Sequence, residues 1–227
     1  MSLRAGDRVV LKLGGGVAAD AAARAFALHG AGAELVVVHG AGPQISEELR
    51  SLGLAVEFVD GRRVTTVEAL AVVRASLLTV GAELCRALGP LALHLAGDEI
   101  GLVATPLPHL GEVGAPLPTR PEAIEAALAA GRIPVVTPIA VGPLNVNADE
   151  AAAALAVGLD ADRILFVSDV PGVLVGGAVA ARIAGPEADR LLSGGELEGG
   201  IVPKLLAAVT AARVGVRAEI GATEVSA

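Results

Sequence analysis

The sequence is nearly without aromatic side chains, and this absence excludes one class of partner. It contains no Trp, no Tyr and only three Phe, so it lacks the stacking platforms on which single-stranded nucleic acids bind. The 17 basic residues are outnumbered by 25 acidic ones, for a formal net charge of −8, whereas nucleic-acid-binding proteins usually carry a basic footprint. We therefore expect no nucleic-acid partner.

Long apolar runs and cysteine pairs are also missing. Hydrophobic residues make up 53% of the 227 residues, yet no stretch reaches the roughly 18 to 20 continuous apolar residues of a membrane-spanning helix. The longest candidate, 133–148, is broken by prolines, a glycine and asparagines, and the N-terminus lacks the apolar segment of a signal peptide. Cys85 is the only cysteine, which excludes an internal disulfide and disfavours a zinc cage. The sequence predicts a cytoplasmic protein without a membrane partner.

Lysine, asparagine and glutamine are scarce, which makes the few examples informative. Arg accounts for 15 of the 17 basic residues, and the only lysines are Lys12 and Lys204. Asn occurs only at Asn145 and Asn147, and Gln only at Gln44. Lys differs from Arg where a compact ammonium must approach a charge as a point donor, and phosphate is a common charge of this kind. We interpret these survivors as residues that no substitute can replace.

The order of elements predicts an α/β fold. A strand at 8–13 is followed by three glycines and an Ala-rich helix to His29. A second strand at 34–38 leads through a glycine loop to a helix at 44–52. Such alternation is typical of a largely parallel sheet that helices cover on both faces, so we expect a three-layer αβα sandwich with a central, mostly parallel sheet.

The remaining segments continue this alternation. We expect an extended segment with a turn at 58–65, hairpins at 101–118, a loop at 97–99, strands at 91–96, 133–137, 163–168 and 216–220, the last being the final strand, and helices at 66–88, 121–130, 149–159, 186–192 and 203–213. We assign residues 1–227 to one domain, with an N-lobe at 1–160 and a C-lobe at 161–227.

Both lysines lie where an anion would bind. Lys12 stands at the carboxyl end of the first strand, where open α/β sheets bind ligands, and the next glycines allow a phosphate to approach the backbone. Lys204 lies at a helix N-terminus, where the helix dipole already favours an anion, so a cation is unhelpful there unless a ligand brings negative charge. Asp149 and Asp169 could orient the lysines or a metal, or could instead serve as a helix N-cap and a turn residue.

Other motifs are less specific. The loop at 39–44 has two of the three glycines of a dinucleotide fingerprint, but Ile45 stands where the third is required. His29, His94 and His109 lack a partner motif and are interpreted as structural or exposed. Ser168 lacks the context of a nucleophile elbow.

Seven motifs follow one another along nearly the whole chain. They are VVLKLGGG (9–16), VVVHGAGPQ (36–44), VDGRRVT (59–65), GRIPVVTPIAVG (131–142), LNVNAD (144–149), SDVPGV (168–173) and GGIVPK (199–204). In this order they resemble the amino-acid kinase superfamily, and within it most closely the N-acetylglutamate kinases. One such motif would be weak evidence, whereas seven in register are strong.

The resemblance implies transfer of the γ-phosphoryl group of ATP to the γ-carboxylate of N-acetyl-L-glutamate, a step of arginine biosynthesis, with Mg²⁺ bound through the nucleotide phosphates and not by the protein. By this match Lys12 and Lys204 stabilise the transferring group and Asp149 holds them. The substrate-binding residues would be Ala41, Gly42, Arg63 and Asn145. The nucleotide would contact Gly14, Gly15, Asp169, Val170, Pro171, Gly172, Val173, Leu174, Glu196, Leu197, Glu198, Gly199, Gly200, Ile201, Val202 and Pro203. The N-lobe would bind the acceptor and form the dimer, and the C-lobe would bind ATP.

Three departures from the family pattern modify this expectation. Ala41 replaces a glycine, so its methyl group could tighten the pocket. The chain ends early, and we interpret 221–225 as the remnant of the closing segment that relatives usually have. The nucleotide lobe is then shortened, which affects the adenine contacts and the affinity for ATP. It also begins without the N-terminal helix that arginine-inhibited hexameric relatives use, so we expect a homodimer that is insensitive to arginine.

Two alternatives remain open at the level of sequence. The first is a sister kinase that acts on carrier-bound aminoadipate or glutamate, since the acetyl pocket cannot be derived from one sequence. The second is a catalytically weak regulatory or amino-acid-binding domain. The presence of both lysines with Asp149 argues against the second.

Overall fold

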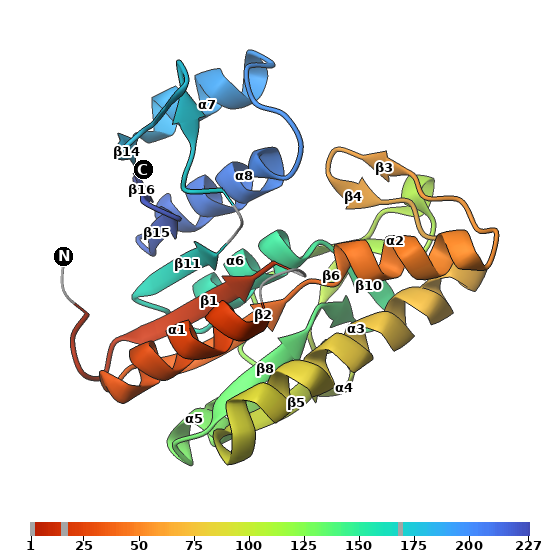
Figure 1. Cartoon of the computed structure of the whole chain (residues 1–227), viewed down its shortest axis with the longest axis horizontal. Coiled ribbons are helices and arrows are strands. Elements are labelled where there is room, and N and C mark those ends of the chain that lie inside the picture. Colours follow the sequence, from red (N-terminus) through yellow and green to blue (C-terminus); the bar gives the residue numbers. More distant parts are fainter. Residues whose placement is uncertain (1–2, 15–17, 168–169) are drawn as a thin grey trace.

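An eight-stranded sheet forms the centre of the computed structural model, which describes residues 3–14, 18–167 and 170–227 (Figure 1). In spatial order its strands are β14 (Arg182–Ile183), β16 (Thr223–Val225), β15 (Arg217–Ile220), β11 (Arg163–Val167), β1 (Arg8–Leu13), β2 (Glu34–His39), β8 (Ile133–Thr137) and β5 (Ala92–Ala96). All neighbouring pairs are parallel except β15 with β16. The expected mostly parallel sheet is therefore confirmed.

Helices cover both faces of this sheet. Their bounds are α1 (Ala18–Gly30), α2 (Gly42–Ser51), α3 (Val67–Leu88), α4 (Gly97–Ile100), α5 (Glu122–Ala129), α6 (Ala148–Gly158), α7 (Gly185–Ser193) and α8 (Ile201–Ala212), with short 3-10 turns η1 (Gly89–Leu91) and η2 (Pro108–Leu110). In Figure 1, α1 and α3 lie in front of the sheet. Within the described ranges, every helix is too short or too polar to span a lipid bilayer.

The alternation of side chains along β1 explains the two cores. Successive residues of a strand point to opposite faces, so Val9, Leu11 and Leu13 pack in one apolar cluster with residues of α1 and α3. Val10 points the other way and joins a second cluster, which includes residues of α5, α6 and α8. Because both faces are covered, the strands are apolar throughout, as is typical of parallel sheets.

Smaller sheets form the rims. A four-stranded sheet has the order β6 (Ala104–Pro106), β7 (Val113–Pro116), β10 (Leu144–Val146) and β9 (Ile139–Ala140), and two hairpins pair β12 (Leu174–Val175) with β13 (Ala178–Val179) and β3 (Phe58–Val59) with β4 (Arg62–Arg63). Asp60 and Gly61 link β3 to β4 with φ angles of 50° and 75°. Two successive positive φ angles are typical of a type I′ turn, whose twist matches that of a hairpin.

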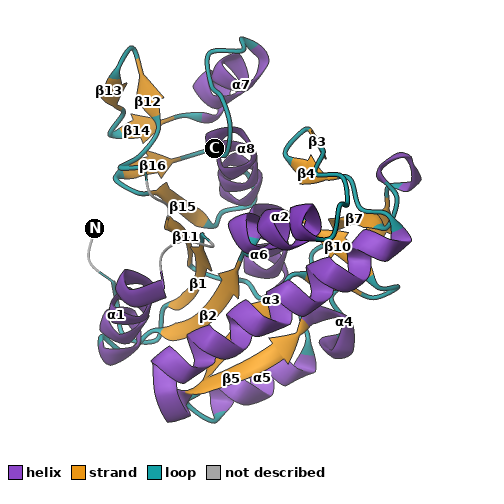
Figure 2. Cartoon of the chain, turned by 45° about the vertical axis from the view of Figure 1, so that its right-hand side comes forward, coloured by secondary structure: helices purple, strands orange, loops and turns teal. Residues whose placement is uncertain are grey.

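Most expected elements are confirmed, with two corrections. The expected loop at 97–99 is instead the one-turn helix α4. The strand at 217–220 is not the last, because the chain turns at Gly221 and returns as β16 between β15 and β14. Figure 2 shows how these last strands gather with α7 and α8 at one end of the molecule.

We expect Gly158→Ala to destabilise the fold. Gly158 ends α6, and an added methyl group would collide with the backbone of Thr119. Overpacking of this kind costs about 1–3 kcal/mol. Gly30→Ala is a matched control, because nothing lies within 4 Å of its added methyl group and Ala is favoured over Gly in a helix by up to about 1 kcal/mol. Urea unfolding should show a lower midpoint for Gly158→Ala alone, and equal midpoints for the two variants would contradict the packing argument.

Candidate active site

One carboxylate lies between the only two lysines of the chain. Lys12 Nζ is 2.8 Å from Asp149 Oδ1, and Lys204 Nζ is 3.4 Å from Asp149 Oδ2. All three side chains are largely buried. The structure therefore brings Asp149 into contact with both lysines, although the three residues are separated by 137 and 55 positions in sequence.

Three elements position these side chains. The side chain of Lys12 lies on the same face of the sheet as that of Val10, the face that α6 covers, because side chains along β1 alternate between the two faces. Asn147 is the N-cap of α6, and its side-chain oxygen accepts hydrogen bonds from the backbone N–H groups of Asp149 and Glu150, at 2.8 and 3.2 Å. Asp149 is therefore free to face the lysines, and its interpretation as an N-cap is wrong. Lys204 lies in the first turn of α8.

The charges of this group depend on one another. Burial lowers the pKa of Lys12, and the neighbouring Lys204 lowers it further, whereas the Asp149 carboxylate raises it. An ammonium in such a place costs free energy unless a negative charge compensates it. Asp149 supplies one negative charge for two positive ones, so the group keeps a surplus of positive charge that an anionic ligand would neutralise.

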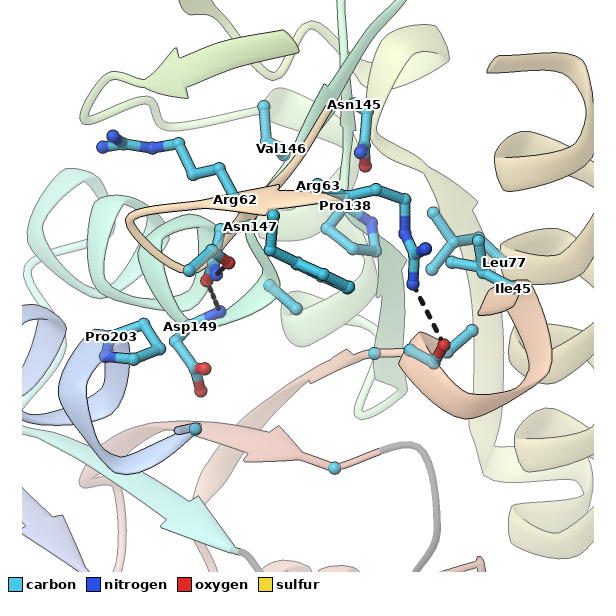
Figure 3. A pocket seen from close by; sticks show the side chains of 18 of the residues that line it. Ile45, Arg62, Arg63, Leu77, Pro138, Asn145, Val146, Asn147, Asp149 and Pro203 are labelled. Atoms are coloured by element: carbon cyan, nitrogen blue, oxygen red, sulfur yellow. Dashed lines mark hydrogen bonds between the residues drawn. The ribbon is translucent and has the colours of Figure 1, made fainter. Parts of the chain in front are cut away.

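A cavity of about 510 Å³ opens beside these residues (Figure 3). Its described lining includes Lys12, Asp149 and Lys204 together with Gly14, Gly40, Ala41, Gly42, Ile45, Phe58, Gly61, Arg62, Arg63, Leu77, Val113, Pro138, Asn145, Val146, Asn147, Gly200 and Pro203. Four of the lining residues are basic and one is acidic, in a chain whose net charge is −8. The local field of this cavity is thus opposite in sign to the overall charge.

All four residues expected to bind the acceptor line this cavity. Arg63 is buried, and its Nη2 donates to Gly42 O at 3.1 Å and to Ser46 Oγ at 2.8 Å. Its Nη1 is buried without a hydrogen-bond partner in the described part of the chain. The guanidinium also stacks on the ring of Phe58, 4.6 Å from the ring centroid. Such a group has the remaining donor that a ligand carboxylate requires.

Asn145 and Ala41 complete the walls of this cavity. Asn145 Nδ2 donates to Thr65 Oγ1 at 2.9 Å, and that hydroxyl donates to Arg63 O at 2.8 Å, so the amide is oriented by its neighbours. Ala41 is 2% exposed and belongs to an apolar cluster with Ile45 and Leu77. The methyl group of Ala41 therefore packs mostly against that cluster.

A second cavity, also of about 510 Å³, adjoins the first. Its described lining consists of Val170, Gly172, Leu174, Glu196, Leu197, Glu198, Gly200, Ile201 and Lys204. Gly200 and Lys204 line both cavities. This cavity combines apolar side chains, which suit a ring of a ligand, with a lysine, which suits a charged group of the same ligand. The two cavities therefore suit two ligands that meet at Lys204.

The other expected nucleotide contacts are distributed more widely. Val173 is fully buried in the apolar core. The carbonyl of Pro171 accepts a hydrogen bond from the N–H of Ala222. Gly14 and Pro203 line the first cavity and not the second. Gly199 and Val202 are not among the lining residues of either cavity, although they neighbour Gly200 and Ile201 in sequence. Gly15 and Asp169 lie outside the described residues.

Two of the four histidines, His39 and His94, meet at the hydroxyl of Thr137. Nε2 of His39 lies 3.3 Å from Thr137 Oγ1, and Nε2 of His94 lies 2.9 Å from the same hydroxyl. Gly81 of α3 leaves room for both rings, because a methyl group there would collide with them. Burial lowers the pKa of His39 to about 4, so its imidazole is neutral at pH 7. His94 shares in this structural cluster, as the sequence interpretation expected.

Sequence reasoning missed two charged residues beside the first cavity. Arg62 lies in β4 next to Arg63, and its Nη2 is 3.0 Å from Oε1 of Glu150. Figure 3 shows Arg62 and Arg63 extending in opposite directions from the strand. The sequence could have indicated this, because adjacent residues of a strand point to opposite sides and the two arginines are adjacent.

An α/β protein with paired lysines beside the carboxyl ends of its strands, and two cavities that meet there, is of the phosphate-binding class. The chain belongs to the amino acid kinase family, whose model matches residues 7–221.

Curated relatives are similar over most of the chain. It is 40% identical over 194 residues to an acetylglutamate kinase of Roseiflexus castenholzii, with coverage of 80% of this chain and 75% of that protein. An acetylglutamate kinase of Kineococcus radiotolerans is 43% identical over 198 residues, covering 74% of this chain and 66% of that one. A third, from a Nocardioides species, is 44% identical over 191 residues, with 74% and 61% covered. The matches thus span 61% to 75% of these relatives' lengths.

Solved structures share the fold. The protein smu.665 from Streptococcus mutans superposes with a TM-score of 0.88 at 29% identity, over 97% of this chain and 98% of that one. N-acetylglutamate synthase from Neisseria gonorrhoeae, complexed with coenzyme A and N-acetyl-glutamate, has a TM-score of 0.83 at 22% identity, over 98% and 60%. A carbamate kinase from Giardia lamblia bound to AMP-PNP has a TM-score of 0.72 at 16% identity, over 99% of both chains. These structures confirm the three-layer fold.

We expect Asp149→Asn to destabilise the protein in a pH-dependent way. Removing one partner of a buried ion pair costs about 3–5 kcal/mol, and here it leaves two ammonium groups facing each other. Burial lowers the pKa of Lys12 in the folded state, below the unfolded value of about 10.4. The unfolded chain therefore binds more protons between these two values, and the variant regains stability as the pH rises from the lowered folded-state pKa toward the unfolded value.

The measurement is urea unfolding at pH 7 and pH 9. Asp189→Asn is the control, because Asp189 pairs with Arg213 at an exposed site and an exposed pair contributes less than about 1 kcal/mol. A free energy of unfolding at pH 7 that is the same for Asp149→Asn and the wild type would contradict the proposed balance of charges.

Proposed function

We propose that this chain transfers the γ-phosphoryl group of ATP to the γ-carboxylate of N-acetyl-L-glutamate, forming an acyl phosphate and ADP. A carboxylate oxygen forms the new bond to the γ-phosphorus, and the bond from that phosphorus to the bridging oxygen breaks, so its electron pair leaves with ADP. The relatives named acetylglutamate kinase support this acceptor, and arginine biosynthesis is then the pathway served.

The observation that carries the proposal is the position of the lysine pair. Lys204 lines both cavities and Lys12 lines the first, while Asp149 contacts both ammonium groups. Phosphoryl transfer depends mainly on the alignment of donor and acceptor and on neutralising the charge of the transferring group. A junction of two cavities with a surplus of positive charge supplies both requirements.

The acceptor needs no general base. A γ-carboxylate has an ordinary pKa of about 4 and is already ionised at neutral pH, so it can attack directly. His39 is buried, neutral and engaged with Thr137, and it takes no part in proton transfer. Catalysis in this proposal is electrostatic: Lys12 and Lys204 stabilise the equatorial oxygens, and Asp149 positions them.

The first cavity suits an N-acylated amino acid. The unpartnered Nη1 of Arg63 would bind the α-carboxylate. Asn145, oriented by Thr65, would contact the amino-acid portion, and the backbone N–H groups of Ala41 and Gly42 would bind the substrate at the start of α2. Phe58, Leu77 and Val113 give the same cavity an apolar wall for aliphatic parts of the acceptor.

The second cavity suits the nucleotide. Leu174, Leu197 and Ile201 would pack on the adenine ring, and Gly172 and Gly200 leave the backbone accessible there. Magnesium, when bound with ATP, would supply further positive charge to the phosphates. In the described ranges no three His, Cys, Asp or Glu residues are grouped as metal ligands, so in this proposal the nucleotide phosphates hold the ion.

The proposal also assigns the two lobes and the assembly. Residues 1–160 would form the N-lobe, which binds the acceptor and makes a homodimer, and residues 161–227 would form the C-lobe, which binds ATP. The separation of the cavities supports this division, since all described protein residues that line only the second cavity follow position 169.

Formation of an acyl hydroxamate tests the reaction and the acceptor together. The chain is incubated with ATP, Mg²⁺, hydroxylamine and one acid from a panel of N-acetyl-L-glutamate, L-glutamate and N-acetyl-L-aminoadipate, and ADP is measured in parallel. We expect hydroxamate and ADP with N-acetyl-L-glutamate and not with the others. A different acid as the best substrate would overturn the acceptor assignment. No ATP-dependent product with any acid, together with binding of N-acetyl-L-glutamate, would favour a binding domain.

We expect Lys12→Arg and Lys204→Arg to fold normally and to lose activity. Guanidinium keeps the positive charge but not the compact shape of ammonium, and loss of one aligned charge at a transition state lowers kcat by about 10²–10³-fold. Steady-state kinetics measure the loss, and circular dichroism checks the fold. Arg182→Lys is the control, because Arg182 pairs with Glu224 at an exposed site. Activity within about twofold of the wild type in both lysine variants would refute the role of the lysines.

A further inference from the structure

We propose that the Arg62–Glu150 ion pair is a positioning device for the acceptor: it holds the β3–β4 hairpin on the first turn of α6, so that Arg63 faces the first cavity. This inference rests on the proposed function, in which Arg63 binds the acceptor carboxylate. Arg62 also lines the first cavity, but its guanidinium is paired with Glu150. In this inference Arg62 and Glu150 therefore act on the acceptor through Arg63.

The ion pair is bidentate and well shielded. Arg62 Nη2 lies 3.0 Å from Glu150 Oε1, and Arg62 Nε donates to Glu150 Oε2 at 3.1 Å. The two side chains are 25% and 14% exposed. Two parallel contacts between a guanidinium and a carboxylate fix orientation as well as distance, so this pair restricts the rotation of β4 more than a single contact would.

The alternation of the strand transmits this restriction to Arg63. β4 consists only of Arg62 and Arg63, and adjacent residues of a strand point to opposite sides. Figure 3 shows this divergence, with Arg63 turned toward Ile45 and Leu77 and Arg62 turned away. On its side Arg63 Nη2 donates to Gly42 O. Once the ion pair holds the Arg62 side chain against Glu150 of α6, the Arg63 side chain is held on the opposite side of the strand, toward α2.

The tip of the hairpin is tied to the catalytic elements as well. Asn147, the N-cap of α6, donates from Nδ2 to Gly61 O at 3.0 Å. A methyl group on Gly61 would lie 3.2 Å from Cγ of Pro203, the residue before Lys204. The hairpin therefore contacts the helical turns that carry Asp149 and Lys204, and these contacts remain when the Arg62–Glu150 ion pair is removed.

Apolar packing contributes little to holding the hairpin. Phe58 and Val59 are 55% and 43% exposed, and only two residue pairs join β3 to β4. A two-stranded hairpin of this size is at best marginally stable by itself. Burial raises the pKa of Glu150, and Arg62 opposes this rise, so loss of Arg62 would leave a buried carboxylate without its described cationic partner.

The experiment compares Arg62→Met, Arg62→Lys and Glu150→Gln with the wild type and with Arg182→Met, an exposed control. For Arg62→Met and Glu150→Gln we expect the KM for N-acetyl-L-glutamate to rise by about 10- to 100-fold, because small displacements of a binding group have effects of this size. The KM for ATP and kcat should stay within about twofold. Arg62→Lys keeps one of two contacts and should lie between Arg62→Met and the wild type.

Hydrogen exchange supplies a readout without substrate. Amides of residues 58–64 should exchange faster in Arg62→Met than in the wild type or in Arg182→Met, while thermal unfolding midpoints stay close. Unchanged KM for the acceptor and unchanged exchange in both Arg62→Met and Glu150→Gln would overturn the positioning role. A wild-type chain that neither binds nor phosphorylates N-acetyl-L-glutamate would instead overturn the proposed function, and the exchange experiment would still decide whether the ion pair holds the hairpin.

Discussion

The contact of the Asp149 carboxylate with two ammonium groups organises the centre of the molecule. It joins β1, the start of α6 and the start of α8, which are far apart in the sequence. Buried cations require a compensating charge, so none of these elements could shift alone without exposing an unpaired charge. The same requirement leaves a surplus of positive charge at the junction of the two cavities. Stability and affinity for an anion therefore have one physical origin here.

The N-terminus of α6 is the second point of convergence. Asn147 caps the helix and also holds Gly61 of the hairpin. Asp149 and Glu150 follow in the same turn and pair with the lysines and with Arg62. Four consecutive residues thus connect the helix cap, the hairpin and the charged group. This arrangement explains how an acceptor site and a phosphate site can be aligned although their residues come from both halves of the chain.

Particular residues show how far sequence reasoning reached. The scarcity of lysine singled out Lys12 and Lys204, and both lie in the site, because rare polar residues persist where their chemistry is required. The alternation of strands and helices predicted the sandwich. In contrast, Asn147 and Asp149 are both good N-caps, so local preference could not decide which one caps α6. Arg62 and Arg63 are identical in type, and only their neighbours distinguish them.

The sequence by itself determined the class of fold, the absence of a disulfide and the identity of the scarce polar residues, because these depend on composition and on periodicities of two and 3.6 residues. Tertiary structure alone decided which charges meet. Lys12 and Asp149 are 137 positions apart, and Arg62 and Glu150 are 88 apart. Contacts at such separations depend on how strands and helices pack, and local preferences carry no information about them. Packing therefore assembles the candidate site, from residues that include the scarce lysines and asparagines singled out by the composition.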